Sequence, residues 1–126
     1  MFPADHKATI RRMAEAFNQR ALTFIDKDFS PHFALLTALA PGWPQGLAGA
    51  RQMFTTMLTT APDMRVTIDD LFAAEDMAAV RWPFGGTQTG PSLIRGAPTG
   101  EPLTVVAIAI YRFANGQTEE DWGVDA

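Results

Sequence analysis

Apolar residues change their spacing once along this chain, near residues 61–63. Before that point they recur every three or four positions, as Leu47, Ala50 and Phe54 do, which predicts amphipathic helices. After it, the segment 64–69 alternates apolar and polar residues, which predicts a half-buried strand. We therefore expect an α+β fold, with a curved antiparallel sheet, N-terminal helices packed on its concave face and a pocket at the open end.

Turn-forming residues divide the rest of the chain into further elements. Helices are expected over residues 5–21, 22–27 and 47–58, with a break at Pro31 and a loop over 41–46. At least four strands are expected, over residues 64–69, 78–84, 103–113 and 118–124. No repeat or linker divides the sequence, so we expect residues 1–126 to form a single domain.

The pair Asn115-Gly116 lies between two β-prone runs, which is the strongest short-range signal for a hairpin. If the turn has two residues, counting outward opposes Arg112 to Glu119 and Ile110 to Asp121. Directly opposed side chains share a face of the sheet. On this register Asp121 lies on the same face as Ile108, Ile110 and Gly123, and the other face carries Tyr111, Phe113 and Trp122.

A carboxylate opposite an apolar wall, as predicted for Asp121, either lies at a wet rim or has its pKa raised by desolvation. The second case provides the acid or base that proton transfer needs. The alternative is a solvated edge strand whose acidic side chains discourage aggregation. The hairpin pattern by itself leaves both interpretations open.

Charge and composition argue against several kinds of partner. The net charge is −4 without a basic cluster, so we expect neither nucleic acid nor a membrane surface as partner. The chain has no cysteine, and its histidines, His6 and His32, have no carboxylate at metal-binding spacing, so we expect no metal site. No secretory signal and no apolar run of the ~20 residues that cross a bilayer is visible, which favours a cytoplasmic protein.

Five further side chains are candidates for a ligand site. His32 follows a proline at a helix boundary and Trp43 lies in a loop, where function is common, although a histidine at such a boundary most often satisfies backbone groups. Trp82 and Phe84 share one face of a predicted strand and could belong either to the core or to a ligand wall. The amide of Gln88 could orient a carbonyl if that strand continues without a bulge; otherwise Gln88 is a surface turn residue.

Seven segments, in order along nearly the whole chain, carry a family resemblance: Gly46–Phe54, Ala61–Asp70, Ala79–Trp82, Gly86–Gly90, Ala97–Gly100, Tyr111–Gly116 and Glu120–Trp122. Together they resemble the SnoaL-like polyketide cyclase family, and His32 falls where that family usually has a histidine. The resemblance implies a cystatin-like α+β cone, shared with nuclear-transport-factor-like proteins, with an apolar pocket. It also implies a homodimer, commonly formed through the outer face of the sheet.

The resemblance further implies a cofactor-free intramolecular aldol reaction in which an aspartate acts as acid/base. The family pattern on the last strand is similar to Glu-His-Trp-Asp, whereas this chain reads Glu120-Asp121-Trp122-Gly123, and Gln88 replaces another family histidine. Asp121 therefore stands at the usual histidine position and Gly123 at the usual aspartate position. Residues two apart on a strand point the same way, roughly 7 Å apart. We therefore hypothesise that Asp121 is the acid/base of the pocket and that Gly123 leaves room for substrate.

Three functions remain open from the sequence. The first is a cofactor-independent cyclase, isomerase or lyase acting on a small, mostly apolar carbonyl compound. The second is a non-catalytic protein that binds such a compound in the same pocket. The third is a dimeric interaction module that uses the sheet face carrying Tyr111, Phe113 and Trp122.

Overall fold

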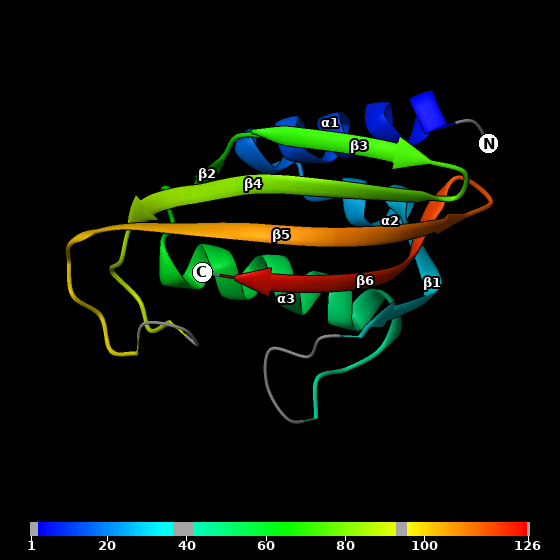
Figure 1. Ribbon diagram of the computed structural model, residues 1–126. Helices are drawn as coiled ribbons and strands as arrows, with labels where there is room; N and C mark the ends of the chain where they lie inside the picture. Colours follow the sequence, from blue (N-terminus) through cyan, green and yellow to red (C-terminus); the bar gives the residue numbers. More distant parts are fainter. Residues whose placement is uncertain (1–2, 37–41, 93–95, 126) are drawn as a thin grey trace.

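The computed structural model describes residues 3–36, 42–92 and 96–125 of the chain. The fold is α+β, as expected from the change in apolar spacing (Figure 1). Its elements are α1 (Pro3–Asn18), α2 (Phe24–Asp28), β1 (Phe29–Leu35), α3 (Gly46–Thr60), β2 (Arg65–Val66), β3 (Asp70–Ala74), β4 (Met77–Thr87), β5 (Pro102–Ala114) and β6 (Gln117–Asp125).

The six strands form one sheet in the order β1-β6-β5-β4-β2, and β3 also pairs with β4. The sheet is mixed rather than wholly antiparallel, because β1 runs parallel to β6. The break expected at Pro31 is not a loop, since Pro31 lies inside β1. A proline is tolerated there because β1 is an edge strand and its pairing with β6 is irregular between Phe29 and Ala34.

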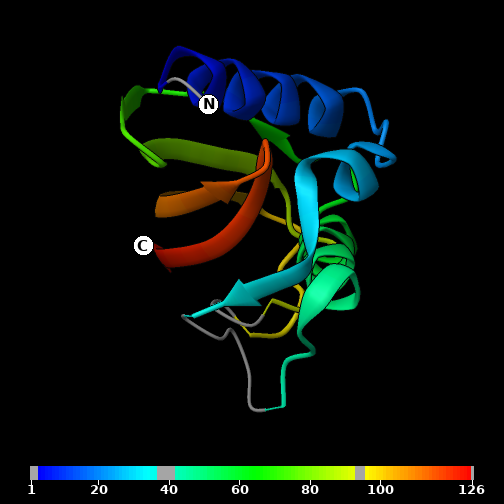
Figure 2. The ribbon, with the colours of Figure 1, turned by 90° about the vertical axis from the view of Figure 1, so that its right-hand side faces the viewer.

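The sheet curves without closing, and the helices lie on its concave side (Figure 2). Helix α1 packs against β2, β3 and β4, whereas α3 packs against β1. The predicted apolar stripe of α1 is buried, with Ile10, Met13 and Phe17 each at most 2% exposed. Phe54 of α3 packs against Phe17 at a ring-centroid distance of 5.9 Å. An aromatic core therefore fills one part of the space between helices and sheet.

The β5–β6 hairpin turns at Asn115-Gly116, whose φ angles of 53° and 77° are those that an Asn-Gly turn adopts. The first pairs are as predicted, with Ala114 opposite Gln117 and Phe113 opposite Thr118. A bulge then shifts the register by one residue. From this point the predicted register is wrong.

Beyond the bulge, Arg112 opposes Glu120, and its Nε lies 2.9 Å from Glu120 Oε1. Tyr111 opposes Asp121. The bulge is needed because Thr118 and Asp121 are both buried, although side chains three positions apart on a regular strand point to opposite faces. One extra residue brings both onto the inner face.

Because of the shift, the side chains of β5 lie on the opposite face of the sheet from the one predicted for them. Tyr111 and Phe113 are buried inside the sheet, 2% and 4% exposed, so they do not form an exposed face. Ile108 and Ile110 lie on the outer face, 47% and 41% exposed. A row of paired residues crosses that outer face, consisting of Phe72, Ala79, Ile110 and Trp122. No helix in the described part of the chain is long and apolar enough to span a membrane.

Candidate functional site

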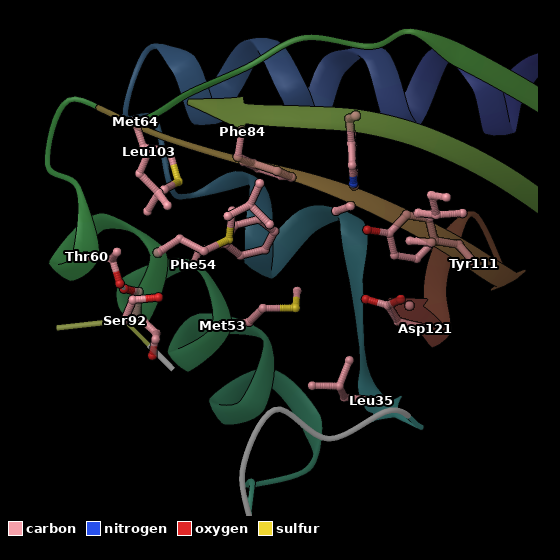
Figure 3. A pocket seen from close by; sticks show the side chains of 18 residues that line it. Leu35, Met53, Phe54, Thr60, Met64, Phe84, Ser92, Leu103, Tyr111 and Asp121 are labelled. Carbon is pink, nitrogen blue, oxygen red and sulfur yellow. The ribbon is translucent and has the colours of Figure 1, made fainter. Parts of the chain in front are cut away.

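A cavity of about 140 Å³ lies between α3 and the inner face of the sheet (Figure 3). Its wall is predominantly apolar. The main apolar contributions are Met53, Phe54 and Met57 of α3, Trp82 and Phe84 of β4, and Leu103 and Val105 of β5. Engineered cavities of similar volume with apolar walls hold molecules of about the size of benzene. The cavity therefore suits a small apolar body, and its unbranched methionine side chains can adapt to the shape of that body.

One end of the cavity is polar and is formed by Tyr111 and Asp121. These residues are direct partners across β5 and β6, and both side chains point into the cavity (Figure 3). They are 2% and 4% exposed. Asp121 is the one carboxylate among the described residues that line the cavity. Among the described residues, the cavity thus has a single acidic group, which lies at its polar end and faces a predominantly apolar wall.

The backbone of Asp121 is held on both sides. It pairs with Tyr111 of β5 and with Leu35 of β1, and its carbonyl oxygen accepts a hydrogen bond of 2.9 Å from the N–H of Leu36. A carboxylate on a strand between two paired neighbours is positioned more rigidly than one on a loop. The sheet therefore fixes where the acid meets a ligand.

Gly123 lines the cavity beside Asp121. A Cβ atom at this position would lie 3.6 Å from Asp121 Oδ1 and 3.4 Å from the carbonyl oxygen of Ile108. A side chain here would therefore occupy the space directly next to the carboxylate. The glycine leaves that space open, and the role in making room for substrate stays a prediction.

The opposite end of the cavity is formed by Thr60 and Ser92 (Figure 3). Thr60 Oγ1 donates to the carbonyl oxygens of Thr56 at 3.1 Å and Pro91 at 2.8 Å. The N–H of Gly90 donates to the carbonyl oxygen of Thr60 at 3.0 Å. These bonds tie residues 90–92 to the end of α3 and thereby place Ser92 at this end of the cavity.

Gln88 does not line the cavity but holds the loop that follows β4. It is 2% exposed, and its Nε2 donates to the carbonyl oxygens of Gly96 at 3.1 Å and Ala97 at 3.0 Å. Its Oε1 accepts from Thr99 Oγ1 at 3.4 Å. The amide expected to orient a ligand carbonyl is thus engaged within the protein.

Of the other side chains that the sequence suggested for a ligand site, some line the cavity and some lie elsewhere. Trp82 and Phe84 line the cavity. His32 is exposed on β1, and Trp43 is buried with its indole N–H donating to the carbonyl oxygen of Gly49 at 3.2 Å; neither lines the cavity. Ile110 is also outside it.

The prediction that Ile108 and Ile110 share a face with Asp121 is wrong, because the bulge turns both side chains outward. Ile108 still borders the cavity, although its side chain is about half exposed. The sequence reasoning missed Tyr111 for the same reason. Thr104 and Arg112 alternate in step with Ile108 and Ile110, and these polar residues could have identified that face of β5 as the outer one.

No group of three or more His, Cys, Asp or Glu residues that could hold a metal occurs within residues 3–36, 42–92 and 96–125. One carboxyl group away from the cavity is electrostatically perturbed. Hydrogen bonds from the backbone and side chain of Thr87 lower the pKa of Asp63 below its usual value. This interaction joins the end of β4 to the segment after α3.

Comparison with known proteins identifies relatives of the whole chain. The family model of the SnoaL-like polyketide cyclases matches residues 7–125. The solved structure of TsrD from Streptomyces laurentii is 25% identical, with a TM-score of 0.86 over 99% of this chain and 90% of that one. No curated protein matches the chain.

Two further solved structures resemble the chain at the same level of identity. IdmH from Streptomyces antibioticus, a proposed polyketide cyclase, is 25% identical, with a TM-score of 0.76 over 94% of this chain and 89% of that one. AclR from Streptomyces galilaeus, a proposed hydroxylase, is 25% identical, with a TM-score of 0.78 over 98% and 79%. One fold is thus associated with more than one reaction, and the reaction must be argued from the site.

Proposed function

Because this chain belongs to the SnoaL-like polyketide cyclase family, we propose that its cavity takes a small, mostly apolar carbonyl compound and that Asp121 moves a proton on that compound without a cofactor. The fold is that of a cyclase- or isomerase-type pocket protein. The observation that carries the proposal is the buried carboxylate of Asp121 at one end of a predominantly apolar cavity, where it is the one acidic group among the described lining residues. A general base needs this combination of enclosure and direct access to the ligand.

The proposed chemistry begins at the carbon next to the carbonyl group. The carboxylate of Asp121 takes a proton from this carbon, and the electron pair of the broken C–H bond moves onto the carbonyl oxygen as an enolate. If the enolate carbon attacks a second carbonyl in the same molecule, a ring closes and Asp121 returns its proton to the alkoxide oxygen that forms. If Asp121 instead returns the proton to another carbon, the compound isomerises. The apolar wall keeps bulk water away from the enolate.

The test compares Asp121→Asn with wild-type protein in an assay that needs no knowledge of the natural substrate. Deuterium uptake from D₂O into the α-position of 1-indanone, a small aryl ketone, is followed by NMR. We expect wild-type protein to accelerate the uptake and Asp121→Asn to lower that acceleration by about 10²–10⁴-fold. Glu120→Gln is the matched control, since Glu120 precedes Asp121 on β6 but pairs with Arg112 on the outer face.

Equal uptake by wild type and Asp121→Asn would end the proposal of a catalytic aspartate. If neither protein accelerates the uptake while both bind 1-indanone, the second candidate is favoured: a protein that binds a small apolar compound without converting it. The predominantly apolar wall supports that alternative, because binding requires only the enclosed apolar surface.

We also propose that a second copy of the chain covers the outer face of the sheet. Phe72, Ile108 and Ile110 are 68%, 47% and 41% exposed on this face, so three large apolar side chains meet solvent on one side of the sheet. Ion pairs flank the apolar row, Asp70 with Arg81 on one side and Arg112 with Glu120 on the other. A surface with both signs of charge around an apolar centre can complement itself across a two-fold axis.

A further inference from the structure

We propose that Tyr111 is a second catalytic residue of the cavity, whose hydroxyl donates a hydrogen bond to the carbonyl oxygen of the bound compound while Asp121 takes the neighbouring proton. This inference rests on the proposed function and extends it. It assigns the polar end of the cavity to two groups with different tasks. One group accepts the proton, and the other stabilises the charge that the departing proton leaves behind.

The register of the hairpin brings the two groups together. Tyr111 and Asp121 are directly opposed across β5 and β6, on the inner face of the sheet. Cβ atoms of directly opposed residues are about 4.5–5.5 Å apart. The hydroxyl and the carboxylate both point into the cavity at the same end (Figure 3). A carbonyl oxygen and its α-carbon are adjacent atoms of one ligand, so the two groups can engage both at once.

The ring of Tyr111 is held in place by other aromatic rings. Trp82 meets it edge to face at a centroid distance of 5.8 Å, and Phe113 does so at 6.5 Å. Tyr111 is 2% exposed, so the ring has little room to change its rotamer. A donor that is already in position does not have to reorganise as charge develops, and this is the property that makes oxyanion stabilisation effective.

The chemistry requires such a donor at this end. When the α-proton moves to Asp121, the negative charge moves from the carboxylate to the ligand oxygen, and a hydrogen-bond donor stabilises it there. Thr60 cannot serve, because it lies at the opposite end and its hydroxyl donates to the carbonyls of Thr56 and Pro91. The indole of Trp82 is the rival donor, since Trp82 also lines the cavity.

The arrangement also sets the orientation of the ligand. Its carbonyl end lies against Tyr111 and Asp121, and its apolar body lies along Met53, Phe54 and Phe84 toward Thr60 and Ser92. The compound class is therefore a ketone or aldehyde with an enolisable carbon and an apolar body. A carbonyl buried in the middle of a bulky molecule would not reach the polar end.

The closing experiment measures binding rather than turnover. In Asp121→Asn the neutral amide resembles the carboxyl group after it has taken the proton, so 4-nitrophenolate serves as a stable stand-in for the enolate. Nitrobenzene has a similar body without the oxyanion. We expect Asp121→Asn/Tyr111→Phe to bind 4-nitrophenolate about 10- to 100-fold more weakly than Asp121→Asn, as loss of a hydrogen bond to a charged group implies. Nitrobenzene should bind equally to both, because phenylalanine preserves the ring contacts.

Equal affinity of the two variants for 4-nitrophenolate would overturn the inference, as would an equal loss for both ligands, which would indicate packing. The parallel variant Asp121→Asn/Trp82→Phe tests the rival donor. If this variant loses affinity for 4-nitrophenolate alone, and Asp121→Asn/Tyr111→Phe does not, the donor is Trp82 instead. These results do not depend on turnover. The proposed function fails separately, if Asp121→Asn retains the wild-type rate of deuterium uptake.

A second readout guards against a folding defect in the variants. Tyr111 is the only tyrosine of the chain, so biosynthetic incorporation of 3-fluorotyrosine labels this one hydroxyl-bearing ring. In Asp121→Asn we expect 4-nitrophenolate to shift the ¹⁹F resonance more than nitrobenzene does. Identical shifts with the two ligands would show that the ring senses occupancy of the cavity without donating to an oxyanion.

Discussion

Gly90 determines whether the end of α3 can remain in contact with the cavity rim, the segment 90–92 that places Ser92 at the cavity. A Cβ atom at position 90 would lie 1.9 Å from the carbonyl oxygen of Thr59, whereas ordinary van der Waals contact begins at 3.4 Å. The substitution Gly90→Ala must therefore separate the two segments by about 1.5 Å. The obstructing atom belongs to the backbone of a helix, so it cannot move aside as a flexible side chain would.

The separation breaks two hydrogen bonds that hold the rim. These are the bond from Gly90 N–H to the carbonyl of Thr60, at 3.0 Å, and the bond from Thr60 Oγ1 to the carbonyl of Pro91, at 2.8 Å. At about 0.5–1.5 kcal/mol each, their loss should lower the free energy of unfolding by about 1–3 kcal/mol. Ser92 should also withdraw from the cavity, so nitrobenzene should bind more weakly.

Urea denaturation followed by circular dichroism measures the change in stability, and Gly85→Ala is the matched control. A Cβ atom at position 85 would lie 3.7 Å from Thr104 Oγ1 and 3.8 Å from the carbonyl of Leu103, which are ordinary contacts. That variant should remain within about 0.5 kcal/mol of wild type or gain stability through a less flexible unfolded chain. If Gly90→Ala unfolds at the same urea concentration as Gly85→Ala, the rim is not held in the way described.

Two further predictions concern the outer face of the sheet and the response to acid. Ile110→Lys introduces a charge into the apolar row and should yield a monomer in light scattering at a protein concentration where wild type is a dimer; a monomeric wild type would contradict the proposed pairing of copies. Asp63→Asn weakens the acceptor for the N–H of Thr87. Because the pKa of Asp63 is lowered in the folded protein, its contribution to stability is present above the unfolded pKa and is lost as the pH falls through the folded pKa. The variant should therefore unfold at a lower temperature than wild type at pH 7, with a gap that narrows in acid; a gap independent of pH would show that the carboxylate charge has no part in it.

Local patterns in the sequence were sufficient for the helices and for most of the turns. The helix expected over residues 47–58 corresponds to α3, Gly46–Thr60, because helical spacing and the Ala61-Pro62-Asp63 stop act within a few residues. The Asn115-Gly116 turn lies where it was predicted, since positive φ is a property of those residue types. These features depend on neighbours in sequence and can be read from it.

The path of β1 and the role of Gln88 could not be read in this way. A proline predicts the end of a helix or strand unless it can lie on an edge strand of a sheet. Pro31 lies on such an edge strand only because β6, about ninety residues later in the chain, pairs with β1. Gln88 was weighed as a ligand contact, but its partners are the carbonyls of Gly96 and Ala97 in a loop that local patterns do not place. Both outcomes follow from contacts between segments far apart in the chain.

The sequence by itself determined the α+β order and the hairpin turn, and it left open whether the acid of the last strand lies inside or in solvent. Tertiary structure decided which side chains share the cavity with that acid. The bulge beyond Thr118 arises where β6 must pair with β5 on one side and β1 on the other while keeping Thr118 and Asp121 inside. That one-residue shift replaces Ile110 by Tyr111 beside Asp121, because a change of register by one moves every side chain of a strand to the opposite face.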